Sequence, residues 1–398
     1  MAWKRTLWIL WAANFVMMAG MNLVIPFLPL YIESLGVHHI ASLERWSSWV
    51  FSAQFVTSFL FQPLWGAMAD RHGRKVMLLR AGFGMGVMTG LMGLVGAPWE
   101  LLVLRLANGL FSGFISMAVS LQASVTPDED SGSALGTLQT GGIAGSLIGP
   151  LIGGWLAEQL GYHQVFFLTG GLLFVATVIV MLFVHEQHQP RPKAVKQRGS
   201  RLSGLRDLRL LFPVFVASLV TQIGMMSIEP IVTVYAKTLY NGRHLALIAG
   251  LVVAATGIAN LIGAPTLGRL GDRIGQRRIL VGALVMAAVM YVPQALAHGI
   301  PTLLVGRFLL GLFIGGMIPS LNVLVKKLAP PEHLATAYGF NSSSLFLGNL
   351  IGPLIGGMVA STFGIRNVFY VTMAILLVNA AMIAFNRRLG TSLEHEAA

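Results

Sequence analysis

The sequence of 398 residues lacks cysteine, which excludes disulfide bonds, thiolate metal ligands and thiol nucleophiles. Charged residues are also few, at 11% of the chain, and only 15 are acidic. No paired-histidine zinc motif is present, nor a Gly-x-x-x-x-Gly-Lys-Ser/Thr loop for nucleotide phosphates. We therefore expect no enzyme activity, no metal, no cofactor and no energy supply from ATP bound by this chain.

Hydrophobic residues are abundant, at 55% of the chain with a mean hydropathy of +0.73, which is typical of a membrane protein. A helix needs about 20 apolar residues to cross a bilayer. This length predicts twelve spans, at residues 7–32, 46–68, 76–95, 99–124, 133–157, 163–184, 210–237, 244–268, 278–297, 301–327, 333–360 and 366–386. The predicted fold is all-α, with six-helix bundles at 1–187 and 210–398 joined by a basic linker at 188–209.

The net charge of +12 is distributed unevenly along the chain. Most of the 27 Lys and Arg residues fall in alternate loops, in the linker and near the two termini. Because cytoplasmic loops of membrane proteins are enriched in basic residues, both termini and the linker are expected in the cytoplasm. This placement explains the basic character without nucleic acid as a partner.

The two halves repeat each other at an offset of 202 or 203 residues. Arg105-x-x-x-Gly109 recurs as Arg307-x-x-x-Gly311, and Gly145-x-x-x-Gly149-Pro150-x-x-Gly153-Gly154 recurs from Gly348 to Gly357. Similar halves of this kind place a substrate site between them near the bilayer midplane.

A charged loop between two spans is also duplicated. Its glycines permit a sharp turn, and its acid and bases can pair with neighbouring helix ends, so the loop is suited to act as a conformational latch. The residues assigned to this latch are Gly66, Asp70, Arg71, Gly73 and Arg74, with Asp272 and Arg273 in the second copy.

Charges inside spans are costly and therefore indicate functional sites. Arg105 and Arg307 lie near the outer ends of their spans, where each would either hold a proton or anion pathway in place or extend to the interface. Glu229 lies inside the seventh span, directly before Pro230. A carboxyl group buried away from cations can exchange protons under physiological conditions, which predicts Glu229 as the coupling acid. The alternatives are an ion pair with a buried arginine or a position at the wet end of the helix.

Prolines in the first and seventh spans predict that both helices bend where they would line a cavity. Polar, methionine and aromatic positions around these bends would form an adaptable apolar pocket with a few hydrogen-bonding groups. The candidate residues are Asn22, Pro26, Gln54, Phe55, Gln122, Gln139, Gln222, Met225, Met226, Asn322, Asn341 and Phe346. Interhelical hydrogen bonding and packing are the alternative roles for these side chains.

Taken together, the duplicated loop, the Arg105 stripe and the Gly145 to Gly154 motif resemble the major facilitator superfamily over essentially the whole chain. The fifth-span motif is similar to that of the drug:proton antiporters with twelve spans. The resemblance implies a monomeric multidrug exporter of the bacterial inner membrane that exchanges amphiphilic compounds for protons by alternating access within lipid. Asp70 and Arg74 would latch the cytoplasmic side, Arg105 would support proton coupling, and the Gly-Pro surface would help to seal the outer side.

Two features depart from this resemblance. Gln276 stands where the first loop has Arg74, and the antiport motif is present in both halves. Because the superfamily fold also serves other transport, a nutrient symporter or facilitator and a lipid-handling exporter stay open as alternatives.

Overall fold

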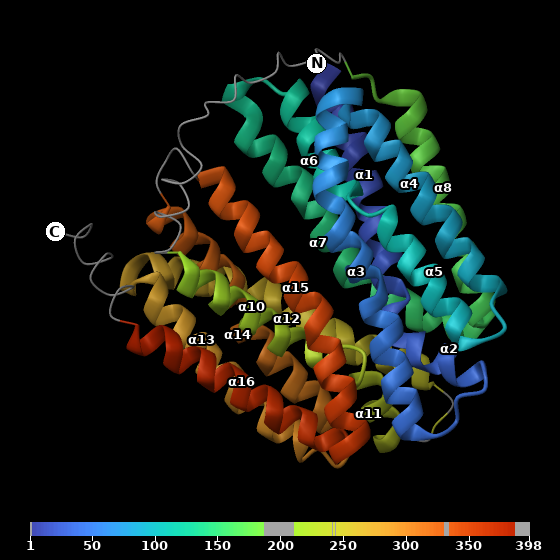
Figure 1. Ribbon diagram of the computed structural model, residues 1–398, viewed down its shortest axis with the longest axis vertical. Coiled ribbons are helices and arrows are strands. Elements are labelled where there is room, and N and C mark those ends of the chain that lie inside the picture. The colour runs from blue at the N-terminus through green and yellow to red at the C-terminus, as the bar shows by residue number, and fades with distance from the viewer. Residues whose placement is uncertain (1, 187–210, 241, 243, 330–333, 387–398) are drawn as a thin grey trace. The chain divides into compact units, whose positions relative to one another are not determined.

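The computed structural model describes residues 2–186, 211–240, 242, 244–329 and 334–386 (Figure 1). Within these ranges the secondary structure is entirely helical. The helices are α1 (Ala2–Leu23), η1 (Ile25–Phe27), α2 (Leu28–Ser34), α3 (Ile40–His72), α4 (Arg74–Leu91), η2 (Met92–Leu94), α5 (Pro98–Leu110), α6 (Phe114–Val125), α7 (Asp128–Leu160), α8 (Tyr162–Phe183), α10 (Phe212–Ile228), α11 (Val232–Leu239), α12 (Leu245–Ile274), α13 (Gln276–Ala295), α14 (Ile300–Leu328), α15 (Leu334–Phe363) and α16 (Ile365–Phe385).

Eleven helical segments in the described residues are long and apolar enough to cross a membrane. They correspond to eleven of the twelve predicted spans. The other predicted span, 46–68, coincides with α3, in which several side chains lie outside the described part of the chain. The predicted all-α membrane fold is confirmed, whereas nearly all of the predicted linker at 188–209 lies outside the described residues.

The chain forms two compact units, and each takes the start of one helix from the opposite half of the sequence. The first unit comprises Met1–His39, Trp49–Ala194 and Gly242–Ala254. The second comprises Ile40–Ser48, Val195–Asn241 and Ala255–Ala398. The start of α3 therefore packs in the second unit, and the start of α12 packs in the first.

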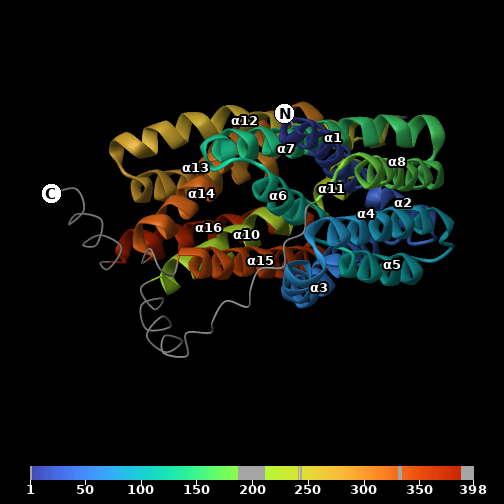
Figure 2. The ribbon, with the colours of Figure 1, turned by 90° about the horizontal axis from the view of Figure 1, so that it is seen from above.

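Small residues bring the helices of the first unit into close contact. α1 lies along α7, and α4 lies along α8 (Figures 1 and 2). A methyl group on Gly153 of α7 would overlap the Leu23 carbonyl oxygen of α1, and one on Gly145 would overlap that of Phe15. Close backbone approach of this kind favours helix association in lipid. Hydrophobic burial contributes little there, because apolar side chains are already surrounded by apolar lipid tails.

The second unit repeats this arrangement, with α10 beside α15 and α16 (Figure 2). Gly356 of α15 packs against the Ser227 carbonyl oxygen of α10, which matches the contact of Gly153 with α1. Polar side chains add further links, since Asn379 of α16 donates a hydrogen bond to the Thr221 hydroxyl at 2.8 Å. The duplicated sequence pattern therefore yields the same type of helix contact in both units.

The first helix of each half is interrupted at its proline, as the sequence predicts. α1 ends at Leu23, and η1 carries Pro26 before α2 continues the span. In the second half, α10 ends at Ile228, and α11 resumes at Val232 after Glu229 and Pro230. Because proline lacks a backbone donor, the helix is weakest at these points. Glu229 thereby occupies a break in its span.

Substitution of Gly153 by alanine is expected to destabilise the protein by roughly 1–3 kcal/mol, because the added methyl group forces α7 away from α1. Gly136 on the same helix has open space around it and is the matched control. Its alanine variant should be neutral or gain roughly 0.5–1 kcal/mol of helix propensity. Thermal unfolding followed by tryptophan fluorescence checks both, and equal midpoints for the two variants would contradict the packing described for α7.

Candidate functional site

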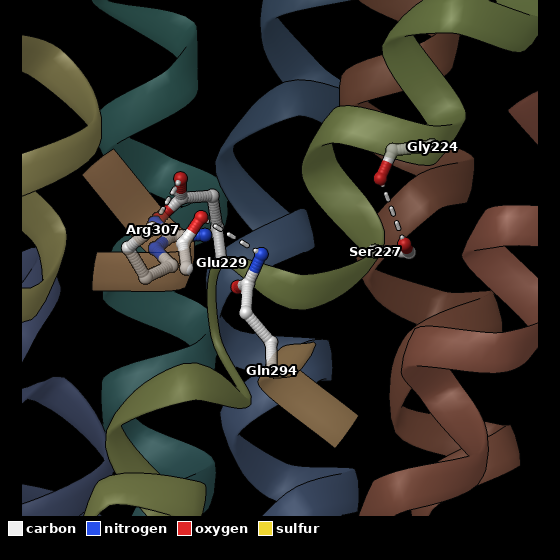
Figure 3. A network of polar contacts seen from close by, with 6 residues as sticks. Gly224, Ser227, Glu229, Gln294 and Arg307 are labelled. Carbon is white, nitrogen blue, oxygen red and sulfur yellow. Dashed lines mark hydrogen bonds and ion pairs between the residues drawn. The ribbon is translucent and has the colours of Figure 1, made fainter. Parts of the chain in front are cut away.

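A buried ion pair joins two helices of the second unit. Arg307 Nη2 on α14 lies 3.2 Å from Glu229 Oε1 at the break between α10 and α11 (Figure 3). The Arg307 side chain is 2% exposed, and that of Glu229 is 19% exposed. The carboxylate is thus the member of the pair that keeps some access to the surroundings.

The surroundings of this pair leave part of the carboxylate unsatisfied. Glu229 Oε2 is buried and has no hydrogen-bond partner. Gln294 of α13 lies nearby with its amide nitrogen donating to the Gly306 carbonyl oxygen at 3.3 Å (Figure 3). The observed ion pair corresponds to the alternative role that the sequence offers for Glu229, a partner for a buried arginine. A role of Glu229 in proton coupling stays a prediction. The second carboxylate oxygen, Oε2, accepts no hydrogen bond.

Arg105 has a different partner, although it is the repeat equivalent of Arg307. Its Nη1 donates to the Gln54 side-chain oxygen at 2.6 Å, while Nε and Nη2 are buried without partners. The side chain is 5% exposed, so the interfacial position considered for it is not the one observed. α5 and α3 approach closely here, because Gly109 packs on the Gln54 carbonyl oxygen. Arg105 is therefore a buried cation held by a neutral amide.

The first copy of the predicted latch forms a tight turn between α3 and α4. Gly73 adopts φ 96°, a backbone conformation that favours glycine, and separates the two helices. Arg74 donates through Nη1 to the Ser120 carbonyl oxygen at 3.0 Å, and Arg71 is exposed. The surroundings of Gly66 and the side chain of Asp70 lie outside the described part of the chain.

A carboxylate that the sequence analysis did not select caps this turn. Glu186 accepts hydrogen bonds from the backbone N–H groups of Arg74 at 3.0 Å and Lys75 at 2.8 Å. These donors begin α4, where a negative charge also offsets the helix dipole. Because Glu186 is more than 100 residues distant in sequence, no local motif could have indicated this cap.

The second copy of the latch uses the residue that departs from the family pattern. Gln276 donates to Asp272 Oδ1 at 3.0 Å and accepts from the Ser320 hydroxyl at 3.0 Å. Arg273 lies beside Asp272 in the last turn of α12 and is exposed. Gln276 therefore ties the carboxylate of Asp272 to α14 within the second unit.

The antiport motif of α7 contacts the start of α12 within the first unit. Added methyl groups on Gly154 and Gly250 would overlap the carbonyl oxygens of Ala246 and Pro150, respectively. Beyond this contact, Glu158 accepts a hydrogen bond from the Leu247 N–H at 2.8 Å. Glu158, from the first half of the sequence, therefore caps the start of α12, from the second half. The other glycines of the motif, Gly145, Gly149 and Gly153, contact α1.

The second unit contains the equivalent contact between α15 and the start of α3. Gly357 packs against Ser48 and against the carbonyl oxygen of Glu44. The Glu44 side chain precedes the predicted span at 46–68, is 2% exposed and has no ion-pair partner among the described residues. Burial raises the pKa of its carboxyl to about 7. Glu44 was missed because its neighbours in the sequence give no sign of burial.

Most of the predicted cavity amides join helices within a unit. Asn341 accepts from Ser218 at 2.6 Å and donates to Asn322 at 3.0 Å, and Gln222 donates to Asn349 at 2.6 Å. Gln122 is buried and donates a hydrogen bond to the Thr126 hydroxyl. Asn22 donates to the Met18 carbonyl oxygen of its own helix, whereas Gln139 is exposed. The remaining candidates are partly or fully buried, namely Pro26, Phe55, Met225, Met226 and Phe346. Substrate contact stays a prediction for all of these residues.

Comparisons with known proteins identify the family. The model of the Major Facilitator Superfamily matches residues 10–249 and 214–396. The "Multidrug resistance protein MdtG" of Enterobacter lignolyticus (strain SCF1) is 42% identical over 388 residues, which cover 97% of this chain and 93% of that relative. The protein of the same name from Rahnella sp. (strain Y9602) is 40% identical over 95% of this chain and 92% of its own length. The chain belongs to the Major Facilitator Superfamily.

Solved structures show the same fold at low sequence identity. A bacterial homologue of the human lysosomal transporter Spinster, in an inward-facing and unoccupied conformation, superposes with a TM-score of 0.80 at 14% identity and 98% coverage of both chains. The nucleoside transporter NupG superposes with a TM-score of 0.78 at 14% identity, covering 95% of this chain and 98% of its own. The family match and the eleven apolar helices of the described residues together identify the chain as a multi-pass membrane protein of a transporter superfamily.

Removal of one member of the Glu229 and Arg307 pair is expected to cost more than removal of both. Each single glutamine variant should lose roughly 3–5 kcal/mol of unfolding free energy, because the other buried charge loses its partner. The double glutamine variant should lose less than either single variant, so more than about 3 kcal/mol of the summed loss should be recovered. Denaturant unfolding in detergent measures this cycle, and strictly additive losses would show that the two charges do not interact.

The stability of the protein should fall as the carboxyl of Glu44 ionises. Because burial raises its pKa to about 7, the folded state favours the neutral acid. This contribution is complete below the usual carboxyl pKa and is lost as the pH rises through about 7. Glu44→Gln should therefore match the wild type near about pH 5 and unfold at a higher temperature near about pH 8. Midpoints that differ by the same amount at both pH values would contradict the burial of this acid.

Proposed function

We propose that this chain is a secondary active transporter that exports amphiphilic drug-like compounds in exchange for protons by alternating access. Membership of the superfamily supports transport, and relatives named as multidrug resistance proteins over nearly the full length support drugs as the cargo. The observation that carries the proposal is the partly exposed Glu229 at the break in its span, beside the buried Arg307.

The ion pair supplies a means of holding and releasing one proton. When the carboxylate is charged, Arg307 offsets the cost of its burial. Protonation removes the attraction to the guanidinium and changes the relative energies of two conformations. A ligand shifts such an equilibrium only if it interacts differently with the two states, and a proton on Glu229 meets this condition. Drug binding and proton binding would then favour opposite states.

Helix-end contacts would couple the site to the gates. On the cytoplasmic side, the latch residues Asp70 and Arg74, with Asp272 and Arg273, would hold the outward-open state. On the outer side, two contacts between α7 and the start of α12 would stabilise the inward-open state. They are the packing of Gly154 on Ala246 and the hydrogen bond from the Leu247 N–H to Glu158. Such contacts at both ends are suited to rocking motions between two discrete arrangements.

The proposed setting is the bacterial inner membrane, with both termini in the cytoplasm and a monomer surrounded by lipid. The repeated halves would be functional domains at 1–187 and 210–398, joined by the basic segment at 188–209. The uneven distribution of Lys and Arg supports this orientation. A membrane potential of about 150 mV provides about 3.5 kcal/mol per proton, enough for a gradient of a few hundredfold.

Exchange of protons for drug is expected to depend on Glu229. In proteoliposomes with an imposed pH gradient, addition of an uncharged amphiphilic dye should release protons in the wild type, because each dye molecule displaces one. Glu229→Gln should lose the dye-dependent proton signal by at least about tenfold, since the amide cannot ionise. Dye fluorescence and an internal pH indicator measure both fluxes in the same vesicles.

Glu100→Gln is the matched control, because it removes an acid near the start of α5 whose carboxylate accepts a hydrogen bond from the Gly96 N–H. This variant should exchange dye for protons at the wild-type rate. Full exchange by Glu229→Gln would move the coupling role to another acid. Uptake of the dye with protons would instead favour a symporter, and competition by lipid would favour a lipid-handling exporter.

A further inference from the structure

A groove between α1 and α8 combines an apolar lining with a cation at one end. It lies within the first unit and has a volume of about 570 Å³. Its α1 side runs from Arg5 to Val16, and its α8 side runs from Ala176 to Phe183. Apart from Arg5, each described residue of the lining is apolar. Such a lining suits a hydrocarbon chain that carries one charged group at its end.

The groove is about as long as one leaflet of a bilayer is thick. Arg5 and Val16 lie 11 positions apart on α1, which corresponds to about 16 Å at the rise of an α-helix. Half of the hydrocarbon core of a bilayer is about 15 Å. Because the first predicted span begins at residue 7, Arg5 is expected at the depth of the lipid head groups and Val16 near the midplane. The groove therefore has the length and the depth of a single acyl chain.

The charges around the head-group end of the groove are positive. The Arg5 guanidinium carbon lies 5.5 Å from the centroid of the Phe183 ring, a cation–π contact that holds the guanidinium at the end of the groove. Lys4 is exposed beside it, and the first turn of α1 contains no acid. Glu186, close to the same end of α8, accepts hydrogen bonds from the start of α4. This end of the groove therefore favours an anionic group.

The walls of the groove are open to the surroundings. Trp8 is 60% exposed, Ile179 is 43% exposed and Phe183 is 46% exposed. α8 is the most apolar of the eleven membrane-spanning segments in the described residues. Exposed apolar side chains on such a helix contact lipid tails, and aromatic residues at its end are typical of the membrane interface. A molecule from the bilayer can therefore enter the groove from the side.

We propose that this groove binds one anionic phospholipid, with its phosphate at Arg5 and one acyl chain between α1 and α8. Basic pockets between membrane helices recognise anionic head groups in this way. A zwitterionic lipid is disfavoured, because its ammonium group would lie close to the positive charges of Arg5 and Lys4. The bound lipid is a resident ligand of the first unit, so this site is independent of the proposed export of drugs.

Native mass spectrometry of the purified protein tests the head-group preference directly. The probes are phosphatidylglycerol and phosphatidylethanolamine with identical acyl chains, which differ in net charge. The affinity for the first bound lipid is measured for each probe. The wild type should bind phosphatidylglycerol about 5- to 30-fold more tightly, as expected for one or two basic residues at the membrane surface.

Variants of Arg5 locate this preference. Arg5→Gln should reduce it about fivefold, because one of the two positive charges is removed. Arg5→Lys keeps the charge and should retain most of the preference. Arg278→Gln is the matched control, since it removes the same charge from an exposed arginine at the start of α13, and it should bind both lipids like the wild type.

A second pair of variants tests the place of the acyl chain. Ala12 is an exposed residue of the lining, so Ala12→Phe should fill the groove without disturbing the helix contacts. Its affinity for both lipids should fall by at least about fivefold, because the ring takes the place of several methylene groups. Leu182→Phe adds a ring to α8 at a site that is 58% exposed and outside the lining, and it should change neither affinity.

Four outcomes would overturn the proposal. Equal affinity of the wild type for the two lipids would exclude head-group recognition, and an unchanged preference in Arg5→Gln would place it elsewhere. Wild-type affinities in Ala12→Phe would show that the acyl chain lies outside the groove. A dimer that is lost in Ala12→Phe would make a second copy of the chain the occupant. Because no transport is measured, failure of this lipid site and failure of drug export are separate results.

Discussion

The cost of an unpaired charge in an environment without water governs this structure. A helix crossing the bilayer satisfies its own backbone, but each buried charged side chain needs a partner within the chain or from a ligand. Arg307 has such a partner in Glu229, and Glu186 and Glu158 satisfy the N-terminal donors of α4 and α12. Arg105 has only a neutral amide. Among the described residues, Arg105 and Glu44 are therefore buried ionisable groups without an ion-pair partner.

The repeat explains both the similarity of the two halves and this difference. Glycines at equivalent positions produce equivalent backbone contacts, as Gly154 with Ala246 and Gly357 with Glu44 show. The two halves differ at the residue before the proline of the interrupted helix, which is Ile25 in the first half and Glu229 in the second. Glu229 can pair with an arginine, and Ile25 cannot. A duplicated scaffold can thus hold two different chemical functions without a change in helix packing.

Sequence patterns predicted the features that depend on local chemistry. Span length and proline position gave the helices and the breaks at Pro26 and Pro230, because these follow from bilayer thickness and a missing backbone donor. Partners between distant segments were not predictable in this way. Gln54 and Arg105 are adjacent only because Gly109 lets α5 approach α3, and nothing near Glu44 or Glu186 in the sequence indicates what they contact.

The membrane potential would supply the energy for the proposed exchange, because a proton that moves inward carries positive charge toward the negative side. This movement is worth about 2.3 kcal/mol per 100 mV for each proton. At about 150 mV one proton could therefore sustain a gradient of a few hundredfold for a neutral cargo. An acid at a break in its span, paired with a buried arginine, is a group that could hold such a proton.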